Sequence, residues 1–388
     1  MCSRTERRSG LDLVRAGWLA LVVVAAALPA SAGAVESADL DQCGNGTFET
    51  PLICEGARWI NGNVNASSAH FWEGDSISYR IKFSGLVVSS SNEVAIEWDT
   101  TKAGKHAVDY LTSFDRTDQA LTCSGVAGCQ QAIFSTFPIP ADPNVSGAGV
   151  AQEAGLFTIW GGSITGVSAY TLSGTYAGDS STRITITFTA LQPNPVLAWG
   201  GHLARPDDWE SQGGTAVTIA GSPYHSRLLD LNGSGSLQDR ALSSTAVRLD
   251  SKVTIVKQTV PEGDPQDFEY FASGLEPQTF VLDDDASDSA HPQSMTFDRL
   301  LIPLGTGEYV VDELPVGPWW LPSGEPACEA NFGATSTVDP YPAGVSITLE
   351  YGDRVVCTFT STQVADLIFG DGFASGDTSA WSNAFPRD

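Results

Sequence analysis

Apolar and polar residues alternate with a period of two along much of this chain. In the second half the alternation is regular in four segments, 252–259, 267–274, 307–321 and 354–362, which clusters of Pro, Gly and Asp separate. An alternation of this kind is typical of half-buried antiparallel strands joined by turns. Repeated at this spacing, it predicts a small β-sandwich.

The first half carries a second set of strand candidates, rich in Ile, Val, Thr, Phe and Trp. They are residues 77–83, 94–99, 156–160, 183–190 and 196–201. Turn-forming Gly, Asp, Asn and Pro lie between them and favour chain reversal. We therefore expect an immunoglobulin-like β-sandwich with long loops, and its three tryptophans Trp98, Trp160 and Trp199 should pack in the core.

Two segments of the first half do not follow this alternation. In residues 106–116, Val108 and Leu111, and Tyr110 with Phe114, approximate a helical stripe, which predicts a helix. Residues 118–153 hold three prolines and few alternating positions, so we expect a loop that runs over the surface.

The chain is longer than one sandwich core usually needs, so we expect an all-β protein of two antiparallel sandwiches. The predicted division is a leader at 1–34, sandwiches at 35–248 and 249–362, and a tail at 363–388.

The leader has the features of a secretory signal peptide. Arginines, among them Arg7 and Arg8, precede an apolar run at 16–28, and small residues follow up to Ala34. General secretion is expected, with the twin-arginine route as the alternative. No later apolar segment is long enough to span a membrane. The sequence therefore predicts a secreted or cell-surface protein.

The formal net charge is −26, with 20 basic against 46 acidic residues. Nucleic-acid binding is excluded, because phosphate contacts need Lys and Arg gathered on one face. The acidity serves solubility in the simplest interpretation, and cation binding is the alternative.

Six cysteines remain once Cys2 leaves with the leader, and an even number in an exported protein predicts disulfides. Their spacing suggests local pairs that cross no domain boundary. These pairs are Cys43 with Cys54, Cys123 with Cys129, and Cys328 with Cys357. A zinc site is disfavoured, since there is no C-x-x-C motif.

The motifs KVTIVKQT, DFEYFASG, GEYVVDELPVGPWWL and RVVCTFTST, in this order, resemble the prealbumin-like fold domain of SpaA-type surface proteins. Such modules act as spacers, as braces or as display platforms, and not as catalysts. Several of them crosslink themselves through an amide bond between a first-strand Lys and a last-strand Asn, promoted by a Glu. The resemblance assigns the lysine to Lys252 or Lys257 and the acid to Glu313.

Ser361 stands where that Asn would be needed, so self-crosslinking is not expected. A disulfide between Cys328 and Cys357 would then take over the task of holding the last strand.

Two further resemblances carry no activity. The motifs EWDTTKAGKHAVDYL, TYAGDSSTRITITF, AWGGHLARPDDW and SPYHSRLLDLNGSG resemble an uncharacterised module of bacterial exported proteins. The tail motif DGFASGDTSAW is similar to a recurrent ending of such proteins, DGFxSGDTSAW. Three aromatic residues of the tail, Phe369, Phe373 and Trp381, either dock on a partner or pack back on the second sandwich.

Residues 229–240 begin like a calcium loop. Asp230, Asn232 and Ser234 alternate before a glycine, which is the spacing of oxygen ligands around a hard cation. An EF-hand would have a bidentate Glu where Ala241 stands, so Asp239 would have to supply the missing carboxylate ligand. The alternative is a turn in which the Asp and Asn side chains cap their own backbone.

Three other groups of residues are candidates for chemistry. Asp283, Asp284, Asp285 and Asp288 should form a solvated loop, because like charges repel. His202 and His225 have no third ligand at a telling spacing and should be packing or surface residues. The set Gly74, Asp75, Ser76, Asp288 and His291 resembles the motifs of GDS-type esterases. That chemistry needs a parallel strand in an α/β fold, which is not expected here.

The sequence thus predicts a non-enzymatic surface, matrix or envelope protein that acts through protein or glycan contacts. A calcium-dependent binding module and, less favoured, a secreted hydrolase are the alternatives.

Overall fold

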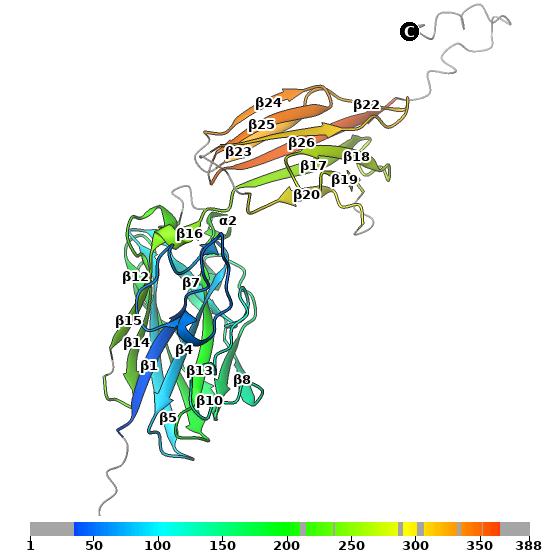
Figure 1. Ribbon diagram of the computed structural model, residues 1–388. Coiled ribbons are helices and arrows are strands. Elements are labelled where there is room, and N and C mark those ends of the chain that lie inside the picture. The colour runs from blue at the N-terminus through cyan, green and yellow to red at the C-terminus, as the bar shows by residue number, and fades with distance from the viewer. Residues whose placement is uncertain are drawn as a thin grey trace, which may run out of the picture. The chain divides into compact units, whose positions relative to one another are not determined.

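The computed structural model describes residues 35–209, 215–235, 237–285, 290–300, 306–331, 335–350 and 352–364. The regular elements formed by these residues are nearly all strands, with a few short helices, so the expected all-β fold is confirmed (Figure 1). The expected leader and nearly all of the expected tail lie outside the described residues.

Residues 37–248 form a sandwich of two seven-stranded sheets. One sheet has the order β2-β1-β4-β13-β9-β8, and β7 also pairs with β13. Its strands are β1 Ser37–Cys43, β2 Trp59–Ile60, β4 Ser76–Ser84, β7 Val108–Thr112, β8 Phe134–Pro138, β9 Leu156–Trp160 and β13 Val196–Leu203.

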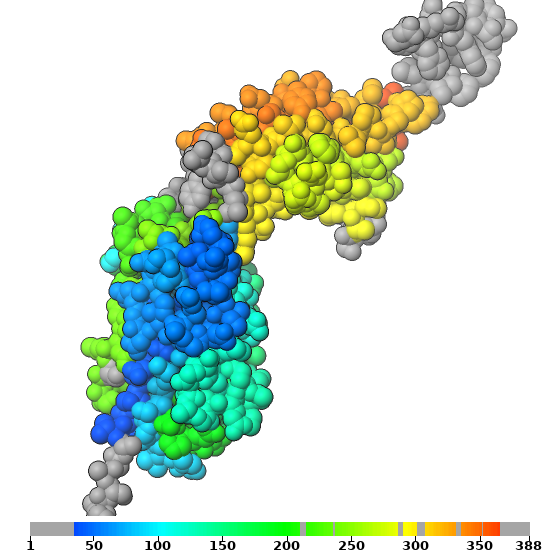
Figure 2. All heavy atoms as spheres, viewed as in Figure 1, coloured from blue at the N-terminus to red at the C-terminus, as the bar shows by residue number. Residues whose placement is uncertain are grey.

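The facing sheet has the order β10-β12-β5-β14-β15, with β11 beside β12 and β6 beside β5. Its strands are β5 Ser91–Lys102, β6 Lys105–His106, β10 Gly162–Val167, β11 Thr171–Gly174, β12 Ser180–Ala190, β14 Tyr224–Leu231 and β15 Gln238–Leu242. The short strands β3 Phe71–Trp72 and β16 Val247–Arg248 pair in parallel. Figure 2 shows the N-terminal segments of this sandwich, in blue, forming much of the surface on the side in view.

The core of this sandwich comes from alternate residues of the facing strands. On β5, for example, Val94, Ile96 and Trp98 are all buried, while their neighbours are partly or fully exposed. Trp98, Trp160 and Trp199 are at most 2% exposed, which confirms the expected packing role of all three.

The helix expected at 106–116 is wrong. Strand β7 occupies this segment, and all five of its residues are buried. It pairs with β13, where Gly200 permits the close approach: a Cβ at this position would lie 2.5 Å from the Ser113 carbonyl oxygen. Backbone pairing with a central strand outweighs a weak helical stripe, because helix propensity is a small term.

The segment 118–153 is more ordered than the surface loop that we expected. It contains the strand β8 and the helix α1, Pro143–Gly147. Asp142 caps this helix by accepting a hydrogen bond from Asn144 N, and Pro143 follows it at the start of the helix. The other helices are α2 Pro206–Trp209 and the 3₁₀ turns η1 Gly56–Arg58, η2 Ala216–Thr218 and η3 Ser244–Ala246.

Residues 252–363 form a second, smaller sandwich of two five-stranded sheets. One has the order β20-β17-β26-β22, with β23 beside β26, and the other has the order β19-β18-β21-β25-β24. The strands are β17 Lys252–Val260, β18 Phe268–Ser273, β19 Thr279–Leu282, β20 Ser294–Phe297, β21 Thr306–Glu313, β22 Trp320–Pro322, β23 Ala327–Asn331, β24 Thr337–Tyr341, β25 Gly344–Glu350 and β26 Arg354–Gln363.

The first and last strands of the second sandwich, β17 and β26, pair in parallel over nine residues (Figure 1). The sheets within the described residues each lie entirely in 37–248 or in 252–363, and so do the hydrophobic clusters. Independent folding of the two parts stays a prediction. Among the described residues no helix is both long and apolar enough to cross a membrane.

Candidate functional site: a buried lysine cluster and a pinned loop

A cluster of charged and polar side chains lies between the two sheets of the second sandwich. Lys257 on β17 and Ser361 on β26 come from one sheet, and Glu313 at the end of β21 comes from the other. The Lys257 Nζ lies 2.7 Å from Glu313 Oε2 and 2.6 Å from Ser361 Oγ. The Ser361 hydroxyl donates to Glu313 Oε1 at 2.6 Å. We call these three residues the lysine cluster.

The register of the strands brings the lysine cluster together. In the parallel pair, Lys257 lies opposite Phe359 and Thr259 lies opposite Ser361. Residues two apart on a strand share a face, so Lys257 and Ser361 point to the same side of the sheet. In the facing sheet Tyr270 lies opposite Glu313 and donates its hydroxyl to Glu313 Oε2 at 2.9 Å.

Burial controls the electrostatics of the lysine cluster. Lys257 is fully buried, and its Nζ lies 3.6 Å from the centroid of the Phe268 ring. Desolvation lowers the pKa of Lys257, and the Glu313 carboxylate offsets this only in part. Burial, with the Glu313 charge added, raises the pKa of Tyr270 well above its ordinary value. Because Lys257 and Ser361 are shielded from solvent, they are placed to hold strands together rather than to meet a substrate.

Of the two lysines that the resemblance left open, Lys257 is the one placed in the cluster. Lys252 instead pairs with Asp250 at 3.0 Å. Ser361 has no side-chain carbonyl carbon that an amine could attack, so the cluster is held by hydrogen bonds and charge. A disulfide between Cys328 and Cys357, which are directly paired residues of β23 and β26, ties the last strand to its neighbour.

A loop of the first sandwich is fixed by Arg80, a side chain of the sheet beneath it. Arg80 on β4 donates to the carbonyl oxygens of Thr122 at 2.6 Å and Ser124 at 2.9 Å. Its Nε lies 3.0 Å from Asp41 Oδ2. The disulfide between Cys123 and Cys129 closes this loop, and another joins Cys43 to Cys54.

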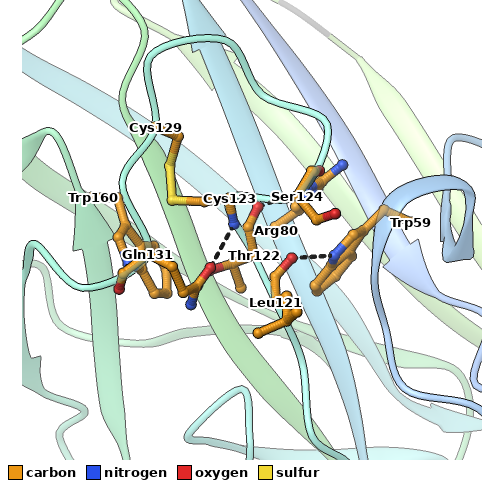
Figure 3. The surroundings of a disulfide bond; sticks show 9 residues. All are labelled: Trp59, Arg80, Leu121, Thr122, Cys123, Ser124, Cys129, Gln131 and Trp160. Carbon is orange, nitrogen blue, oxygen red and sulfur yellow. Dashed lines mark hydrogen bonds between the residues drawn. A yellow bond between two sulfur atoms is a disulfide. The ribbon is translucent and has the colours of Figure 1, made fainter.

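Two tryptophans hold the same loop from either side. Figure 3 shows Trp59 and Trp160 flanking residues 121–124. Trp59 Nε1 donates to Leu121 O at 3.0 Å, and Trp160 Nε1 donates to Gln131 O at 2.9 Å. The loop is therefore preorganised by buried side chains as well as by its disulfide, which the sequence alone did not indicate.

A cleft of about 380 Å³ opens beside this pinned loop. Phe134, Leu156 and Trp160 form apolar parts of its wall, and Asp115 and Gln119 add polar groups. Phe134 is 55% exposed although it is a large apolar residue. A rigid cleft with mixed lining suits a small amphipathic ligand or the side chains of a partner.

The candidate calcium residues make contacts within the protein. Asp230 accepts hydrogen bonds from the backbone N–H groups of Gly233 and Gly235, both at 2.7 Å, as in the capping turn that was the alternative. Asn232 adopts a positive φ of 53° and accepts from Glu93 N at 2.8 Å.

The other two candidates, Ser234 and Asp239, are engaged separately. Ser234 donates to Leu231 O at 2.6 Å, and the Asp239 carboxylate on β15 pairs with His225 Nδ1 at 2.8 Å. Calcium binding by Asp230, Asn232, Ser234 and Asp239 stays a prediction.

The solvated loop expected at the aspartate run is wrong for two of its members. Asp283 and Asp284 are buried. Asp284 Oδ2 accepts from Thr259 N at 3.0 Å and Gly263 N at 2.7 Å, so the carboxylate organises a turn. Burial alone would raise the pKa of Asp284, but the hydrogen bond from the Thr259 hydroxyl, together with those from Gly263 N, Thr259 N and the Gln293 side chain, outweighs it and lowers the pKa. Asp288 lies outside the described residues.

The esterase-like residues have structural contacts. Asp75 accepts a hydrogen bond from Trp72 N at 2.7 Å. Ser76 begins the antiparallel strand β4, is fully buried and accepts from the Thr112 hydroxyl at 2.8 Å. His291 pairs with Asp267 at 3.1 Å. A buried serine of this kind is not placed as a nucleophile, which must be exposed to its substrate.

A buried network around Asp109 was missed. His202 Nδ1 lies 2.7 Å from Asp109 Oδ1, and Trp209 Nε1 donates to Asp109 Oδ2 at 3.0 Å. An oxygen or nitrogen atom of each of Asp109, His202 and Asp208 lies within 4.8 Å of the others, but Arg205 already binds both Asp208 oxygens at 3.1 Å. The sequence pattern does not reveal this network, because Asp109 lies in the segment that was expected to form a helix.

No family model and no curated protein matches this chain. Solved structures give weak similarities. BcpA, the major pilin subunit of Bacillus cereus, is 8% identical, with 84% of this chain and 71% of that chain covered and a TM-score of 0.21.

Two further solved structures give similar values. A Mobiluncus mulieris adhesin with intramolecular disulfide, isopeptide and ester bond cross-links is 8% identical, with 74% of this chain and 90% of that chain covered and a TM-score of 0.20. The major pilin SpaD of Corynebacterium diphtheriae is 9% identical, with 85% of this chain and 68% of that chain covered and a TM-score of 0.22. TM-scores this low do not support a functional inference.

Proposed function

We propose that this protein is a non-enzymatic structural and interaction component outside the cytoplasm, in the cell surface, matrix or envelope. The observation that carries the proposal is the lysine cluster, in which a buried lysine, a carboxylate and a hydroxyl connect β17, β21 and β26. The disulfide between Cys328 and Cys357 adds a covalent tie at β26. Disulfides persist in oxidising compartments, which agrees with the exported location expected from the leader.

The partner that we propose is a protein or a glycan, bound at the cleft beside the pinned loop. An uncharged glycan fits the lining best, because Phe134 offers an exposed apolar ring, and Asp115 and Gln119 offer hydrogen-bonding groups. The high negative charge of the chain disfavours an anionic partner.

The test combines location with contact. Fractionation of the source cells, followed by protease shaving of intact cells, should find the protein outside the cytoplasm, and recovery in the cytoplasm would overturn the proposal. Binding to uncharged cell-surface glycans should weaken in Phe134→Ser and persist in Leu191→Ser, an exposed apolar control outside the cleft lining. Turnover of ester or glycan substrates that is lost in Ser76→Ala would instead support a hydrolase.

The two-domain division belongs to the same proposal. Separate chains of residues 35–248 and 249–362 should each unfold in one cooperative transition, because each part has its own sheets and core. If neither folds alone, the boundary is wrong.

A further inference from the structure

An apolar cleft of about 270 Å³ lies in the second sandwich beside the short strand β22. Its lining includes Phe268, Leu314, Val316, Trp320, Leu321 and Pro322. The Phe268 and Trp320 rings meet edge to face, with centroids 5.4 Å apart, and give the cleft a firm aromatic wall. The cleft also reaches Glu313 of the lysine cluster.

Large apolar side chains remain exposed around this cleft. Leu314 is 37% exposed, Trp319 is 44% exposed and Leu321 is 53% exposed. They fall within one short stretch of chain, from the end of β21 to β22. A concentration of exposed apolar groups at a concave site indicates that something covers it.

The chain itself leaves the sandwich at the rim of this cleft. Trp320 pairs with Gln363, the last residue of β26, and Leu321 pairs with Thr362. Beyond the strand, Val364 N donates to Trp319 O at 2.8 Å. The segment that follows Val364 therefore starts next to the exposed side chains.

The sequence that follows has the composition of an occupant. After Ala365 and Asp366 come the three apolar residues Leu367, Ile368 and Phe369, followed by a glycine. An extended chain spans about 3.3–3.6 Å per residue, so Phe369 can reach ~17 Å from Val364, which is enough to enter an adjoining cleft. A tether this short gives an effective concentration in the millimolar range, so even a weak apolar contact is populated.

We propose that Leu367, Ile368 and Phe369 of the same chain bind in this cleft, with the Phe369 ring against the wall formed by Phe268 and Trp320. The bound segment covers Leu314, Trp319 and Leu321, and it shields the edge of the lysine cluster at Glu313. This contact goes beyond the proposed function and does not depend on it.

The direct test is photo-crosslinking of the full chain. p-Benzoylphenylalanine in place of Phe369 should crosslink to the tryptic peptides that contain residues 314–322, in a product with the mass of one chain. The same group in place of Phe385, near the end of the tail, is the matched control and should not label these peptides. A crosslinked dimer would show that a second copy of the chain occupies the cleft. The absence of crosslinks to the cleft would show that the tail does not bind there. Either result overturns the proposal.

A second measurement uses the unmodified chain. Hydrogen exchange of amides 366–370 should be about two- to tenfold slower than that of amides 376–384, as a tethered weak contact implies. Leu321→Asp places a charge in the cleft and should abolish this difference, whereas Phe385→Ser should leave it unchanged. Equal exchange of both segments in the wild-type chain would show that the tail does not dock.

Discussion

A buried ion pair in each sandwich, Arg80 with Asp41 and Lys257 with Glu313, has a different structural role. In the first sandwich Arg80 and Asp41 meet at 3.0 Å, and in the second Lys257 and Glu313 meet at 2.7 Å, with all four side chains at most 7% exposed. The wide guanidinium of Arg80 reaches two loop carbonyls in addition to Asp41. The compact ammonium of Lys257 gathers only groups that converge on one point, and so it joins two sheets.

The two pairs also differ in how much support they have. Asp41 has a second cation beside it, because Lys82 Nζ lies 3.1 Å from the same oxygen. Glu313 is supported by neutral hydroxyls, from Tyr270 and Ser361. Removal of one partner should therefore be more costly in the second sandwich, since a buried charge without a partner is strongly destabilising.

The largest effect is expected from making the lysine cluster covalent with Ser361→Asn. The Lys257 Nζ should attack the new side-chain carbonyl carbon, so that the N–C bond of an amide forms, the bond to the amide nitrogen breaks and ammonia leaves. The lowered pKa of Lys257 favours the neutral amine that this attack needs. Intact mass spectrometry should show the loss of one ammonia, and the product should melt at a higher temperature.

The control for this variant is Ser361→Asn combined with Glu313→Ala, which removes the carboxylate that takes up the proton. This double variant should show no loss of ammonia in its intact mass. If Ser361→Asn folds and also keeps its ammonia, the cluster geometry does not place the amine for attack.

The next largest effect is expected for Glu313→Ala. It leaves the Lys257 ammonium buried without its carboxylate, which typically costs about 3–5 kcal/mol in the free energy of unfolding. Urea denaturation should measure this loss. The double variant Lys257→Met with Glu313→Leu removes both charges and should be close to wild type in stability, and a large loss there would mean that the pair itself is stabilising.

A buried carboxyl group in each sandwich should give opposite pH dependences. Burial raises the pKa of Glu73 to about 7 from an ordinary value of 4.5, although the Thr215 hydroxyl donates to it. The folded state therefore holds this proton more tightly, so its contribution is full below pH 4.5 and is lost as the pH rises through about 7. The difference amounts to about 3 kcal/mol.

Asp284 of the second sandwich has a lowered pKa, so its contribution is present above its ordinary pKa and is lost as the pH falls below it. Denaturation series across pH should therefore lose the neutral-range slope in Glu73→Gln and the acid-range slope in Asp284→Asn. A Glu73→Gln profile identical to that of the wild type would contradict the assignment.

The smallest effect is expected for Arg80→Ala, because Lys82 still neutralises Asp41. The lost hydrogen bonds to Thr122 O and Ser124 O should cost about 1–3 kcal/mol. Hydrogen exchange of residues 119–131 should accelerate at the same time. The control is Lys82→Ala, which removes the other cation beside Asp41. Within the described part of the chain, Lys82 makes no hydrogen bond to residues 119–131, so this variant should leave their exchange rate unchanged. An equal acceleration in both variants would show that Arg80 does not pin the loop.

Alternation along the chain was sufficient to predict most of the fold. The segments 94–99 and 252–259 lie in β5 and β17, where a period of two buries one face of the strand. Residues 77–83 lie in β4, although that strand is buried on both faces over most of its length. The resemblance that rested on these motifs also supplied Glu313 and Ser361 as members of one site.

Most of the longer strands, the burial of Trp98 and the local cysteine pairs could be predicted from the sequence, since each depends on neighbouring residues or on composition. The choice between Lys252 and Lys257 required the folded protein, because it depends on the parallel register of β17 and β26. The tertiary structure also decided that residues 108–112 form a strand and that Asp284 is buried. In both places contacts with distant backbone, at β13 and at Thr259, outweigh the local preference, and no local pattern records such contacts.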